Sequence, residues 1–126
     1  MLRHHGLDDR LIHQVYDSKI LTKLLYALPS WWGFLSQAAK NQLESFVRKS
    51  CKLNYCKPAY KTISEIAKQL DLDLFQNITA NTNHCLHHLL PPIKQTHYNL
   101  RAKRHNFTLP TKDDRNFLHR CLFNFL

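Results

Sequence analysis

Hydrophobic residues recur at helical spacing in several separate stretches of this chain. In the first, residues 8–28, large apolar side chains return at every fourth position: Ile12, Tyr16, Ile20, Leu24 and Leu28. Such a spacing places them on one face of an α-helix. The pattern therefore predicts an amphipathic helix, which Pro29 should end because the residue before a proline disfavours helical geometry.

Two further helices are predicted from their capping residues and apolar periodicity. Ser36 is a suitable N-cap for a helix that continues to about Leu53. Thr62 and Glu65 have the spacing of a capping box, in which each residue satisfies a backbone N–H of the other. We expect a third helix to begin there and to end near the Asn-rich residues 81–83.

The last part of the chain combines an irregular segment with a terminal helix. Residues between Ile93 and Pro110 show no clear period, so we expect extended or irregular chain there. Thr111, with Asp114 three positions later, predicts the start of a helix that runs into the C-terminus. The sequence thus predicts an all-α fold with three main helices and a C-terminal helix. We expect one folding unit, with a helical region over residues 1–92 and a basic region over 93–126.

The charge of the chain favours an anionic partner. Lys and Arg outnumber Asp and Glu by 18 to 9, which gives a formal net charge of +9. Nucleic acid, RNA or DNA, is the commonest anionic partner of a small basic domain, although a protein can be basic without binding one. The N-terminus lacks the apolar run of a signal peptide, and no stretch approaches the roughly 18 apolar residues of a spanning helix.

These features predict an intracellular protein that is neither secreted nor bound to a membrane. In that setting the cysteines are expected to be reduced thiols. They are Cys51, Cys56, Cys85 and Cys121.

Two basic clusters are the candidate nucleic-acid-binding residues. The first lies between residues 36 and 61, where Glu44 is the single acid, and its candidates are Arg48, Lys49 and Lys52. The candidates in the second are Tyr98, Arg101, Lys103 and Arg104, with Lys94, His97 and His105 around them. Phosphate contacts from Lys and Arg, together with base stacking on aromatic rings, are what single-stranded RNA binding requires. A solvated helix face and a loop are the structural alternative.

Histidines and cysteines give only weak indications of a metal or catalytic site. His84 and His88 would be the nucleus of a zinc site, but the cysteine spacings do not match those of a zinc finger. A dyad of Cys85 with a neighbouring histidine is also disfavoured, because adjacency in sequence is not the geometry that a nucleophile needs. We therefore expect no metal and no other cofactor.

Four strings in the chain stand in a recognisable order. They are LLYALPSWWGF at 24–34, NTNHCLHHLLPP at 81–92, YNLR at 98–101 and HNFTLP at 105–110. In this order they resemble strings found downstream of the palm subdomain in jockey-like non-LTR (LINE-type) retrotransposon reverse transcriptases. The resemblance covers essentially the whole chain and implies a thumb and post-thumb, C-terminal segment of an RNA-directed DNA polymerase.

The same resemblance implies that the catalytic palm and the endonuclease lie upstream of this segment. The polymerase palm holds two metal ions through aspartates that include an aromatic-x-Asp-Asp hairpin. Asp8–Asp9 and Asp113–Asp114 lack an aromatic residue two positions earlier, and both pairs are better explained as helix starts. We therefore expect a chain that is not an enzyme and that binds nucleic acid non-specifically at most.

Both terminal helices resemble parts cut from a longer protein, which is consistent with a truncated retrotransposon product. A domesticated nucleic-acid-binding or protein-interaction module is the alternative. In the parent protein, part of the apolar face of the first helix would rest on the palm. Expressed alone, the chain is therefore expected to be marginally stable, partly molten or self-associating through that face.

Overall fold

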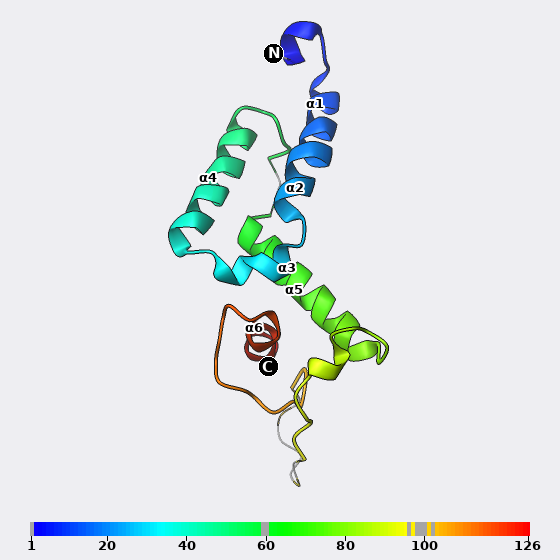
Figure 1. Ribbon diagram of the computed structural model, residues 1–126. Helices are drawn as coiled ribbons and strands as arrows, with labels where there is room; N and C mark the ends of the chain where they lie inside the picture. The colour runs from blue at the N-terminus through cyan, green and yellow to red at the C-terminus, as the bar shows by residue number, and fades with distance from the viewer. Residues whose placement is uncertain (1, 59–60, 96, 98–100, 102) are drawn as a thin grey trace. The chain divides into compact units, whose positions relative to one another are not determined.

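The fold is all-α, as the sequence predicts. The computed structural model describes residues 2–58, 61–95, 97, 101 and 103–126, and these residues form helices without a β-sheet (Figure 1). An isolated antiparallel bridge pairs Ile93 with Phe107.

Contacts within the chain divide it into two compact units. Unit 1 comprises residues 1–28 and 35–66, and unit 2 comprises residues 29–34 and 67–126. Residues 67–92 therefore share a unit with the basic region that follows them.

The first helix of unit 1 contains a π-helical segment. Its consecutive parts are α1 (Asp9–Val15), the π-helical η2 (Tyr16–Leu21) and α2 (Thr22–Leu25). A π-helix closes hydrogen bonds over five residues, so an apolar stripe shifts by one position across it. The side chain buried after Tyr16 is accordingly Leu21, whereas Ile20, predicted to lie in the stripe, is 38% exposed.

The first helix ends before the predicted proline stop. Tyr26 leaves helical geometry at ψ 123°, and Ala27 adopts a positive φ of 50°. Pro29 instead lies in the first turn of the short helix α3 (Leu28–Trp31), which a 3-10 turn, η3 (Trp32–Phe34), follows. Proline is well tolerated at that position because the first backbone N–H groups of a helix have no partner within it.

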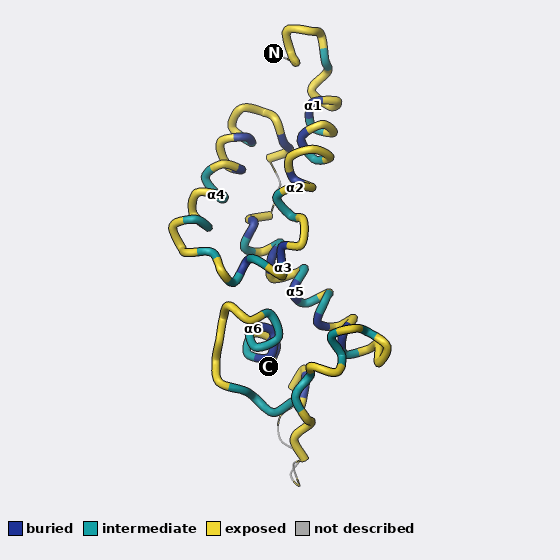
Figure 2. The backbone as a smooth tube through the Cα atoms, in the orientation of Figure 1, coloured by how far each residue is buried: buried dark blue, intermediate teal, exposed yellow. Residues whose placement is uncertain are grey.

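The capping residues predicted for the next two helices are confirmed. The Ser36 hydroxyl accepts a 3.2 Å hydrogen bond from the backbone N–H of Ala39 at the start of α4 (Gln37–Lys52). At the start of α5 (Ile63–Ala80), the Thr62 N–H donates to Glu65 Oε2 at 3.0 Å, and the Glu65 N–H donates to Thr62 Oγ1 at 3.2 Å. The sides of these helices that carry buried residues can be followed in Figure 2.

Unit 2 has a core of its own, built around the C-terminal helix α6 (Phe117–Asn124). Four buried residues form it: Phe75, Cys121, Leu122 and Phe125. Partly buried residues of α5, the chain between α5 and α6, and the start of α6 pack against them: Leu72, Leu90, Phe107, Leu109 and Phe117. The segment before α6 is irregular, as predicted, with backbone hydrogen bonds from Lys94 to Asn106 and from Thr108 to Pro92.

The predicted cap of the last helix is wrong. The helix begins at Phe117, and its N-cap is Asn116, whose side-chain oxygen accepts hydrogen bonds from the N–H groups of Leu118 and His119. Thr111 and Asp114 lie in the irregular chain before it. Asparagine is as good an N-cap as threonine, so the local sequence offered more than one start.

Candidate nucleic-acid interface

The first basic cluster lies on the solvent-exposed side of α4, near its C-terminal end. Arg48, Lys49 and Lys52 are all exposed and fall within five consecutive residues of the helix. Residues three and four positions apart are neighbours on a helix surface, so Lys52 lies beside both other cations. None of the three forms an ion pair with another described residue. We call Arg48, Lys49 and Lys52 the α4 basic face.

The single acid of this region is engaged elsewhere. Glu44 Oε1 accepts hydrogen bonds from the N–H of Ser64 at 3.0 Å and from its hydroxyl at 3.1 Å. The carboxylate therefore faces the N-terminal end of α5, where the helix dipole favours a negative charge. Glu44 and Arg48 also line a cleft of about 640 Å³, whose wall includes Lys61. The α4 basic face thus keeps its positive charge without an acidic partner.

The second basic cluster lies in unit 2, and the structure describes only part of it. Arg101, Lys103 and Arg104 are exposed, whereas the candidate Tyr98 lies outside the described residues. His105 is buried: its Nε2 lies 2.9 Å from the carbonyl oxygen of Leu122, and its Nδ1 accepts from the N–H of Phe107. Its ring therefore contributes to the core of unit 2 and does not present a stacking surface to RNA.

Unit 2 contains a buried ion pair, Arg120 with Asp71, that was not predicted from the sequence. The Arg120 guanidinium donates Nε–H to Asp71 Oδ2 at 2.8 Å and Nη2–H to Asp71 Oδ1 at 3.0 Å. It also donates to the backbone carbonyls of Pro29 and Asp114. Arg120 is 7% exposed and Asp71 3% exposed, so this cation is not part of a surface for phosphate. The sequence does indicate that Asp71 is buried, because it falls on the same helical face as the apolar Ala67 and Phe75.

The same network explains the glycine in the Trp-Trp-Gly-Phe string. A Cβ atom at Gly33 would collide with Arg120 Nη1 and would lie 2.7 Å from the carbonyl oxygen of Arg115. Backbone atoms at that separation must move to admit a side chain. Gly33 is therefore required for the close approach of residues 29–34 to the chain before α6.

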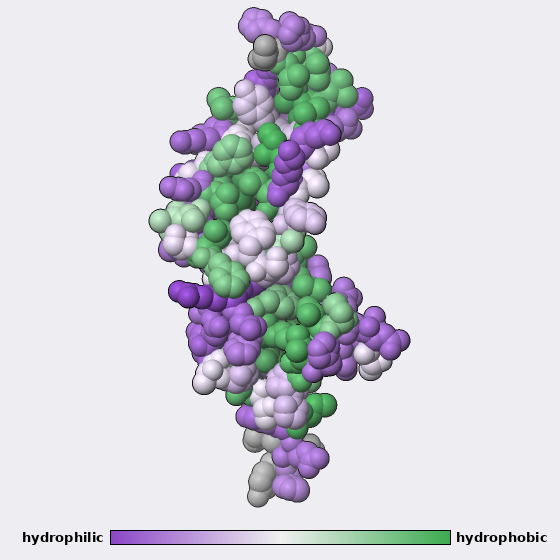
Figure 3. All heavy atoms as spheres, viewed as in Figure 1, coloured by the Kyte–Doolittle hydropathy of each residue, from purple (hydrophilic) through white to green (hydrophobic). Residues whose placement is uncertain are grey.

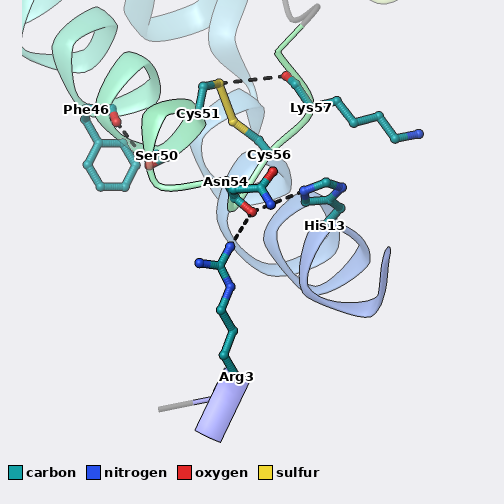
Figure 4. Close-up of a disulfide and its surroundings, with 8 residues drawn as sticks. All are labelled: Arg3, His13, Phe46, Ser50, Cys51, Asn54, Cys56 and Lys57. Carbon is teal, nitrogen blue, oxygen red and sulfur yellow. Dashed lines mark hydrogen bonds between the residues drawn. A yellow bond between two sulfur atoms is a disulfide. The ribbon is translucent and has the colours of Figure 1, made fainter. Parts of the chain in front are cut away.

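Cys51 and Cys56 form a disulfide, which corrects the prediction that all four thiols are reduced (Figure 4). The turn after α4 brings their Cα atoms to 4.9 Å, within the range that a disulfide spans. Within that turn, Asn54 has a positive φ of 59°, and its carbonyl oxygen accepts a hydrogen bond from Arg3. Cys56 is buried with Tyr16 and Leu21 in a small core cluster of unit 1. Cys85 and Cys121 are free thiols.

Of the two weak metal candidates, His84 has a local hydrogen bond. His84 Nδ1 accepts a 3.1 Å hydrogen bond from the N–H of Leu86, and His88 is exposed. No group of three or more His, Cys, Asp or Glu side chains that could hold a metal ion occurs in the described ranges. Cys85 Sγ lies 3.9 Å from His84 Nδ1, but that nitrogen already serves the backbone N–H of Leu86.

No protein-family model, curated protein or solved structure matches this chain. Within the part of the chain that the structure describes, no helix has the length and apolar character needed to cross a membrane. The candidate interface is therefore assigned from the exposure, spacing and charge of its own residues.

Proposed function

We propose that this chain is a non-catalytic, nucleic-acid-binding segment of the thumb and post-thumb type found in jockey-like non-LTR reverse transcriptases. It binds single-stranded RNA or DNA through electrostatics, without sequence specificity, inside the cell. The four ordered strings, from 24–34 to 105–110, support the relationship to that family. The observation that carries the binding function is the exposed α4 basic face, which has no acidic partner.

Like charges on adjacent helical turns repel one another, and a polyanion removes that repulsion. Phosphates that contact Lys and Arg also release condensed counterions, which drives binding at low salt. Positive charge near the C-terminal end of a helix complements the helix dipole as well, so part of its effect is structural. The test must separate that structural effect from binding.

Both aspartate pairs have local contacts that support a non-catalytic role. Asp8 is the N-cap residue of α1, and Asp9 lies 3.4 Å from Arg3 in an exposed ion pair, so the predicted helix start at this pair is confirmed. Asp113 accepts a hydrogen bond from the N–H of Arg115 in the irregular chain before α6. The second pair is not a helix start, contrary to the prediction, and neither pair lies on a strand.

A charge-matched comparison tests this function. Arg48, Lys49 and Lys52 are replaced together by Gln, and a control variant replaces the exposed Lys19, Lys23 and Lys68 by Gln, with the same loss of charge. We expect the first variant to bind a fluorescein-labelled 20-nucleotide RNA about tenfold more weakly than the control variant, as three lost phosphate contacts imply. Circular dichroism checks that both variants keep their helices. Equal affinities of the two variants would overturn the assignment to the α4 basic face.

The second basic cluster is tested separately. A variant with Arg101, Lys103 and Arg104 replaced by Gln should also bind the RNA more weakly if these exposed cations contact phosphate. An unchanged affinity would exclude them from the interface and leave the α4 basic face alone.

A second candidate function is a domesticated module that binds a protein or nucleic acid for its host. An exposed apolar groove in unit 1 favours the protein-binding form of this candidate. Genomic context separates the two functions. Upstream coding sequence for an aromatic-x-Asp-Asp palm would favour a retrotransposon segment, whereas an intact single-copy gene with its own promoter would favour domestication.

A further inference from the structure

Unit 1 carries an apolar groove of about 570 Å³ whose walls come from the N-terminal 3-10 turn η1 (Leu2–His5), α1, η2, α4 and the turn after α4. Six large hydrophobic residues that line it are between 38% and 57% exposed: Leu2, Val15, Ile20, Phe46, Leu53 and Tyr55. Figure 3 shows hydrophobic surface beside α1 and α4 on the face in view. So many exposed apolar side chains in one groove are typical of an interaction site.

A polar group in the wall of the groove also lacks a partner. Tyr16 lines the groove and is 3% exposed, and its hydroxyl has no hydrogen-bond partner among the described residues. Most buried hydroxyl groups in proteins are hydrogen-bonded. The Tyr16 hydroxyl is an exception, and it is buried in the wall of the groove.

The charged residues that line the groove are both cationic. Lys49 lies on the α4 side, and no Asp or Glu is among the lining residues. Arg3 also lines the groove, and its guanidinium donates hydrogen bonds to the carbonyl oxygens of Leu53 and Asn54 and pairs with Asp9. An occupant with acidic flanks would therefore meet complementary charge, chiefly from Lys49 because Arg3 already pairs with Asp9.

We propose that this groove binds an amphipathic helix of a partner protein whose polar flanks are acidic. A groove between helices recognises such a ligand through apolar side chains at helical spacing. The sequence alone predicts self-association through the first helix. However, a second copy brings another chain of net charge +9 and the same two lining cations, so charge favours the acidic helix. This inference goes beyond the proposed nucleic-acid binding and does not depend on it.

Three synthetic 18-residue helical peptides serve as probes for the full-length chain. The first has Leu at positions i, i+3, i+4 and i+7 with Glu on both flanks, the second has Lys in place of Glu, and the third is a scrambled version of the first. We expect the acidic amphipathic peptide to bind at least about tenfold more tightly than the other two, since only it matches both the apolar groove and its charge.

Matched variants locate the binding. Leu53→Ser in the groove should weaken binding of the acidic peptide about tenfold, whereas Leu89→Ser, at a similarly exposed position of unit 2, should leave it unchanged. Lys49→Glu should weaken it more than the control Lys68→Glu on α5. Leu53→Ser should also leave the affinity for RNA unchanged, which separates a failure here from a failure of the proposed function.

Three results would overturn the proposal. One is equal binding of the acidic and basic peptides, and another is binding that Leu53→Ser does not affect. The third is a concentration-dependent dimer in sedimentation that Leu53→Ser abolishes, because a second copy would then be the occupant.

Discussion

Arg120 is the residue of unit 2 with the most consequential polar contacts, since it joins residues 29–34, α5 and α6. Removing one partner of a buried ion pair leaves the other charge uncompensated. We expect Arg120→Met to lower the free energy of unfolding by about 3–5 kcal/mol, measured by urea unfolding followed by circular dichroism. The exposed control Arg115→Met should change it by less than about 0.5 kcal/mol. Equal effects of the two substitutions would contradict the ion pair with Asp71.

The two free cysteines should differ sharply in reactivity. Burial raises the pKa of the Cys121 thiol to about 12, with a further increase from the Asp71 carboxylate that the Arg120 guanidinium opposes. Because the thiolate is the reactive species, iodoacetamide at pH 8 should modify the exposed Cys85 and spare Cys121 until the chain is denatured. Mass spectrometry of the native and denatured protein measures this. Alkylation of Cys121 at the rate of Cys85 would contradict its burial.

The same pKa gives a direction for the effect of pH on folding. In the unfolded chain the Cys121 thiol ionises near its ordinary pKa of 9.0, while in the folded chain it keeps its proton to about pH 12. The contribution of this group to stability is therefore complete below pH 9 and falls as the pH rises from 9 towards 12. Urea unfolding at pH 8 and pH 10 should show the loss. Replacing Cys121 with Ala should make the loss of stability between pH 8 and pH 10 smaller.

At the scale of helices, the structure assigns the cap of α6 to Asn116. Replacing Asn116 with Ala should lower the free energy of unfolding by about 1 kcal/mol, because two backbone N–H groups lose their acceptor. Thr111→Ala should have an effect within about 0.5 kcal/mol, since Thr111 is exposed and lies before the helix. Thermal unfolding of the two variants makes the comparison. A larger loss for Thr111→Ala would restore the cap that the sequence predicts.

Helix starts could be predicted from the sequence where one capping residue stands out, and not where two candidates compete. Ser36 and the Thr62–Glu65 pair act within one turn of chain, so the sequence alone identifies them. Asn116 also acts within one turn, but the local sequence is compatible with a start at Thr111 as well, so it does not decide between the two residues. The π-helical segment after Val15 could not be predicted either, because Ile20 and Leu21 are both apolar and the sequence is compatible with either one as the next buried residue.

At the scale of the whole molecule, the all-α class follows from the sequence, whereas the division into two units does not. Apolar periodicity identifies which residues face inward on each helix, and it also leaves Arg48, Lys49 and Lys52 on an exposed face. The boundary between the two units falls within α5, between residues 66 and 67, and it depends on which parts of the chain the two ends of α5 contact. The Cys51–Cys56 disulfide and the burial of His105 also depend on folded geometry, so the sequence predicted neither.

The salt dependence of RNA binding measures how many phosphates the α4 basic face contacts. For single strands, the slope of log affinity against log salt concentration is about −0.7 per phosphate contact. If the α4 basic face makes three such contacts, replacing Arg48, Lys49 and Lys52 with Gln should make the slope less negative by about 2. The Lys19, Lys23 and Lys68 control should keep the wild-type slope. A slope that is the same in wild-type protein and both variants would contradict a nucleic-acid interface on α4.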